Sequence, residues 1–156
     1  AAALHKGSTL LSLLLVLVLP TAVVGVVANV QGCAAIFAAL PAIVSAATAA
    51  GEVIDAIESF VTSHGGMSRE ISQTIVRVRQ ALSAVLHAAR GANDVHDQDF
   101  QLALAEFQRA YADLFDLVQY FGIRQTEASD RMALDGPDVL IVPSPQRIAH
   151  DMSGAP

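Results

Sequence analysis

The sequence predicts an all-α fold: an antiparallel bundle of three to four helices, preceded by an apolar N-terminal helix that is a signal peptide or membrane anchor. Two patterns predict this fold. Residues 8–33 carry no charged side chain, and from Glu52 onward apolar residues recur at the 3.6-residue period of an amphipathic helix. We therefore divide the chain into the N-terminal segment 1–32, the helical bundle 33–123 and a Pro-containing, largely irregular tail 124–156.

Composition separates the first part of the chain from the rest. Hydrophobic residues make up 53% of the 156 residues and charged residues only 15%, against a usual charged share of about 25%. Before Glu52 the only side chains that can carry charge are His5 and Lys6. The sharpest change of composition falls at Gly51–Glu52, and the chain from Glu52 onward has the composition of a water-soluble helical domain.

The charge balance argues against nucleic acid as a partner. The formal net charge is −6, and the 9 Lys and Arg residues are scattered along the chain. Binding to a phosphate backbone needs a basic cluster or stripe. We therefore expect no nucleic-acid binding.

The apolar segment 8–28 is long enough, at about 30 Å as a helix, to cross the hydrocarbon core of a membrane. A cleaved secretory signal fits Lys6, the apolar core 10–19 and the break at Pro20. A retained membrane anchor fits the total length. Both interpretations direct the chain to the secretory pathway, as a secreted or membrane-anchored protein, with the membrane as a transient or permanent partner.

Cys33 is a candidate lipidation site. The chain has a single cysteine, so no intrachain disulfide can form. The stretch from Val30 to Cys33 resembles the bacterial lipobox, in which small or branched residues precede the lipidated cysteine, although Gln31 departs from that pattern. The alternative is a buried cysteine that packs as a small hydrophobe.

The alanine-rich segment 33–51 supports two interpretations. Alanine contributes little transfer energy, so insertion of this segment into a membrane would be marginal. It could still complete a membrane hairpin over 8–50, because Ala38, Ala42, Ala46 and Ala50 would let two helices approach closely. The interpretation we favour is a helix in the core of the water-soluble bundle.

Three amphipathic helices are predicted after this segment. The first ends at residues 64–66, the second begins at the N-cap Ser68, and the third begins at Asp97 or Asp99 and stops at Gly122. Apolar side chains of the third helix alternate at spacings of four and three, which predicts the core seam of the bundle. This seam comprises Phe100, Leu104, Phe107, Tyr111, Leu114, Val118 and Phe121. In the tail, the apolar run 139–142 is expected to dock on the bundle or to form a short edge strand.

The sequence carries no motif for catalysis, cofactors or metal ions that we rely on. The polar stretch 93–99 contains three aspartates and His96, but it departs from the calcium loop of the EF type and is better explained as a solvated loop that caps the third helix. The histidines are dispersed without zinc spacing, and no nucleophile or phosphate-loop motif occurs. We expect no enzymatic activity and no cofactor.

These observations predict a non-enzymatic helical protein that acts by binding or assembly, with a protein partner or with copies of itself. Two alternatives stay open. One is a membrane-embedded or membrane-active protein that uses the hydrophobic hairpin 8–50. The other is a secreted carrier that holds an apolar ligand between its helices.

Overall fold

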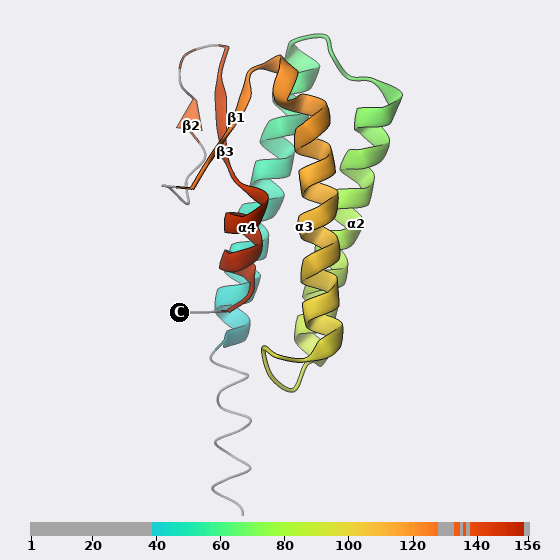
Figure 1. The fold of residues 1–156 in the computed structure, drawn as a ribbon, viewed down its shortest axis with the longest axis vertical. Coiled ribbons are helices and arrows are strands. Elements are labelled where there is room, and N and C mark those ends of the chain that lie inside the picture. The colour runs from blue at the N-terminus through green and yellow to red at the C-terminus, as the bar shows by residue number, and fades with distance from the viewer. Residues whose placement is uncertain (1–38, 128–132, 135, 137, 155–156) are drawn as a thin grey trace, which may run out of the picture. The chain divides into compact units, whose positions relative to one another are not determined.

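The computed structural model describes residues 39–127, 133, 134, 136 and 138–154, which are mostly helical. In this part of the chain, three long helices lie side by side, and a short helix and a small sheet adjoin them (Figure 1). The prediction of a mostly helical protein is therefore confirmed. The segment 1–32, predicted as a signal peptide or anchor, lies outside the described residues.

The first described helix spans Ala39–Ser63, and we call it the leading helix. A stripe of its side chains at spacings of three and four is buried: Ile43, Ala47, Ala50, Ile54, Ile57 and Val61. The helix ends as the sequence predicts, because Gly65 adopts the left-handed conformation with φ 68°. The N–H of Gly66 then donates to the carbonyl of Val61 at 3.1 Å, and the N–H of Gly65 to that of Thr62 at 3.1 Å, which satisfies the last carbonyls of the helix.

The next two helices begin at the expected capping residues. Helix α2 spans Arg69–Gly91, and the hydroxyl of Ser68 accepts from the N–H of Ile71 at 3.1 Å. Helix α3 spans Gln98–Val118, and the carboxylate of Asp97 accepts from the N–H groups of Asp99 and Phe100. Helix α3 continues into the 3-10 turn η1, Gln119–Phe121, and Gly122 ends that turn with φ 100°.

The helices share one hydrophobic core. Its members on α2 are Ile71, Ile75, Val78, Ala81, Leu82, Val85 and Ala89, and those on α3 are Phe100, Leu104, Phe107, Ala110, Tyr111, Leu114 and Val118. Ion pairs bind α2 to both neighbours on the outside of this core. Arg77 pairs with Asp113 on α3, and Arg79 pairs with Asp55 and Glu58 on the leading helix.

A three-stranded sheet departs from the predicted all-α class. Its strands are β1 (Ile123–Thr126), β2 (Ala133–Leu134) and β3 (Leu140–Pro143), in the order β1-β3-β2. Strand β3 pairs in parallel with β1 and antiparallel with β2. The apolar run predicted as a docked segment or an edge strand thus provides the central strand. Leu140 and Val142 alternate into the core, which anchors the sheet to the helices.

The last helix, α4, spans Pro145–Met152 and packs against α3. The buried hydroxyl of Ser144 accepts from the N–H of Arg147 at 3.1 Å, and Pro145 occupies the first turn, where its missing N–H costs no hydrogen bond. Ile148 and Met152 are buried. The sequence predicts a largely irregular tail over 124–156, whereas in the structure strands and this helix occupy most of the described part of it. The proline content suggested irregular structure, but a serine followed by proline is also a signal for the start of a helix, and here it marks the start of α4.

Candidate functional site

The predicted core seam of α3 lies inside the protein. Its members from Phe100 to Val118 are buried, and Phe121 is half-buried against the same core. Phe107 and Tyr111 stack with their ring centroids 6.1 Å apart. These aromatic side chains fill space between the helices.

Tyr111 has a second contact that the heptad spacing does not predict. Its hydroxyl donates to the backbone carbonyl of Pro143 at 2.8 Å, across a separation of 32 residues. Burial disfavours the charged phenolate and raises the pKa of Tyr111 above its ordinary value, so the hydroxyl stays a donor. This hydrogen bond fixes the end of β3, and therefore the start of α4, against α3.

The polar stretch 93–99 is a capping loop. The carboxylate of Asp94 accepts from the N–H of His96 at 2.6 Å, while Asp97 caps α3. The side-chain amide of Gln101 donates to the carbonyl of Val95 at 2.5 Å. Asp94 and Asp97 thus accept hydrogen bonds from nearby backbone N–H groups. The described residues include no group of three or more His, Cys, Asp or Glu side chains that could hold a metal ion. Cys33, the candidate lipidation site, lies outside the described residues.

Ser63, His64 and Asp138 come close to the order of a catalytic triad without its geometry. The Nδ1 atom of His64 lies 2.7 Å from the carbonyl oxygen of Phe60, so it carries the proton and donates there. The hydroxyl of Ser63 lies 2.8 Å from that same carbonyl and donates to it as well. The Nε2 atom of His64 is 3.8 Å from Asp138, whose side chain is 87% exposed. The Oγ atom of Ser63 also lies 3.2 Å from Nδ1 of His64. Because that nitrogen carries a proton and donates to Phe60, it does not act as a base toward the serine in this geometry, and the cluster closes the end of the leading helix.

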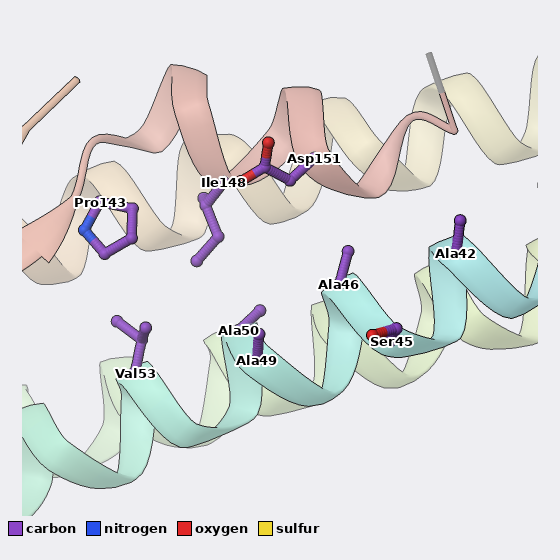
Figure 2. A pocket seen from close by; sticks show the side chains of 9 residues that line it. All are labelled: Ala42, Ser45, Ala46, Ala49, Ala50, Val53, Pro143, Ile148 and Asp151. Atoms are coloured by element: carbon purple, nitrogen blue, oxygen red, sulfur yellow. The ribbon is translucent and has the colours of Figure 1, made fainter. Parts of the chain in front are cut away.

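A groove lies between the leading helix and α4 (Figure 2). Its volume is about 350 Å³. The lining residues on the leading helix are Ala42, Ser45, Ala46, Ala49, Ala50 and Val53, and those on the opposite wall are Pro143, Ile148 and Asp151. We call this the alanine groove.

Small side chains create the alanine groove. Alanines at spacings of three and four line one face of the leading helix, so α4 cannot fill the space between the two backbones (Figure 2). Ile148 projects from α4 toward the leading helix. The carboxylate of Asp151 pairs with Nε of Arg147 at 3.2 Å, so its charge is compensated within α4. The surface offered to a ligand is thus mainly apolar.

No binding site was predicted here from the sequence, although part of one wall was noted as a helix-packing face. The spacing of Ala42, Ala46 and Ala50 already indicated a face where another helix can approach closely. The opposite wall was missed because α4 was not predicted. Its start at Ser144–Pro145 was the signal that could have revealed it.

A shallower hollow borders the leading helix on another side, and it is lined by Asp55, Glu58, Ser59, Thr62 and Ser63. Both carboxylates pair with Arg79 of α2. The hydroxyl of Thr62 donates to the carbonyl of Glu58 at 2.7 Å. These polar groups are thus engaged within the protein, and the alanine groove is the better candidate for binding.

Comparison with known proteins adds no relative from which a function could be transferred. No protein-family model, no curated protein and no solved structure matches the chain.

Proposed function

We propose that the protein is a non-enzymatic helical binding or assembly protein that is secreted or anchored in a membrane. The observation that carries the proposal is the alanine groove, an apolar hollow walled by two packed helices. The location rests on the uncharged segment 8–33. Among the described residues, the leading helix is also long and apolar enough to cross a membrane, by length and composition alone.

The alanine groove suits a partner helix because of its side chains. Ala42, Ala46 and Ala49 expose little more than a methyl group each, so a partner backbone can approach the leading helix closely. Val53 and Ile148 also line the groove, but they are only 5% and 4% exposed, so the exposed alanines provide most of the surface for a partner. Burial of this surface contributes about 25 cal/mol per Å² of apolar area removed from water. We propose a second copy of the chain as the partner, so that the protein assembles through this groove.

Sedimentation velocity on the native protein tests assembly. We expect the molecular mass to rise with concentration, and Ala49→Glu to shift the protein to monomer because it places a charge in the apolar contact. Ala84→Glu is the matched control, since Ala84 is exposed on α2 away from the groove. A native protein that is monomeric at every concentration, or equal loss of assembly in both variants, contradicts assembly through the groove.

Intact mass of the native protein tests the location. Removal of a signal peptide lowers the mass of the native protein below that of its unprocessed precursor. A retained anchor leaves the mass unchanged and resists extraction with alkaline carbonate. Cleavage before Cys33 with an added diacylglycerol mass identifies a lipoprotein. An unmodified full-length chain that carbonate releases from membranes contradicts all of these locations.

A carrier of an apolar ligand is the second candidate, which the size of the groove supports. Its volume of about 350 Å³ falls at the lower end of small-molecule sites, which range over about 300–1,000 Å³. We expect decanoic acid to raise the melting temperature of the native protein, because a ligand that binds only the folded state stabilises it. Ala46→Trp should abolish the increase by filling the groove. An unchanged melting temperature contradicts the carrier function for this ligand.

A membrane-embedded protein that uses the hairpin 8–50 is the third candidate. It is supported by the length and apolar composition of the leading helix. It requires residues 39–50 to leave the core in which Ile43, Ala47 and Ala50 are buried. The contribution of these residues to domain stability therefore separates this candidate from the other two.

A further inference from the structure

We draw no further inference here: the strongest candidate, the alanine groove between the leading helix and α4, belongs to the site already described, and nothing in the structure shows what covers it.

Discussion

Tyr111 shows how one side chain can position a wall of the candidate site. Its ring belongs to the core of α3, and its hydroxyl binds the carbonyl of Pro143, two residues before α4 begins. A buried carbonyl without a donor is costly. The heptad spacing predicts the burial of the ring, because apolar periodicity is a local pattern. The spacing cannot predict the partner of the hydroxyl, because Pro143 lies 32 residues further along the chain.

Removing this hydroxyl should destabilise the protein. Tyr111→Phe keeps the ring but leaves the carbonyl of Pro143 without its donor, and we expect the free energy of unfolding to fall by about 1–3 kcal/mol. Urea denaturation followed by circular dichroism measures the change. Tyr120→Phe is the control, because Tyr120 is 85% exposed and should unfold like the native protein. Equal stability of Tyr111→Phe and the native protein would show that the hydrogen bond contributes nothing.

The same tyrosine should make stability depend on pH above about 10, the ordinary pKa of tyrosine. Burial raises the pKa of Tyr111 in the folded state, so the unfolded chain loses the proton first as the pH rises. The native protein should therefore lose up to about 1.4 kcal/mol of stability per pH unit above pH 10, relative to Tyr111→Phe. Urea titrations of both proteins between pH 9 and 11 measure this difference. Parallel pH profiles for the two proteins would refute it.

At the scale of elements, local signals placed the three long helices, whereas α4 and the sheet were not predicted. Caps at Ser68 and Asp97 and the left-handed Gly65 mark helix ends within a few residues of sequence. Strands β1 and β3 pair although β2 lies between them in the sequence. Neither β1 nor β3 alternates clearly between apolar and polar residues. Parallel pairing of this kind depends on long-range contacts, so local patterns could not predict the sheet.

The junction between η1 and β1 should not tolerate a side chain at Gly122. Its φ is 100°, and a Cβ there would overlap the backbone carbonyl of Asp138. We expect Gly122→Ala to lower the free energy of unfolding by about 2 kcal/mol or more. Gly91→Ala is the control at the end of α2, where a Cβ meets nothing within 4 Å. Differential scanning calorimetry that shows the same melting temperature for both variants would contradict the strained geometry.

The cap of α3 should contribute measurably to stability. Asp97 satisfies two N–H groups at the positive end of the helix dipole. Asp97→Ala should cost about 1 kcal/mol, as measured by urea denaturation. Asp116→Ala removes an exposed carboxylate near the negative end of the same helix and should be neutral or slightly stabilising. The opposite order of the two variants would exclude capping as the role of Asp97.

At the scale of the whole molecule, the functional question is whether residues 39–50 belong to the helical domain. The described residues, from Ala39 onward, lie within one compact unit. Ile43, Ala47 and Ala50 are each at most 4% exposed and share the core with α2 and α3. The leading helix is therefore continuous across the change of composition at Gly51–Glu52. The change of composition at Gly51–Glu52 therefore does not mark the start of the hydrophobic core, because buried residues before it pack against α2 and α3.

Two shortened chains test this conclusion. We expect residues 39–156 to unfold cooperatively in detergent-free buffer, with the melting temperature of the full chain measured in mild detergent. Residues 52–156 should be less stable by at least about 2 kcal/mol, since they lack Ile43, whose burial alone contributes roughly 1.5–3 kcal/mol, and one wall of the alanine groove. If residues 8–50 form a membrane hairpin instead, the chain 52–156 should be at least as stable as the chain 39–156. The longer chain should then aggregate, because its apolar helix would be exposed to water. Calorimetry and light scattering on the two chains distinguish these outcomes. Deleting residues 39–51 lowers the stability only if these residues pack against the rest of the domain in water.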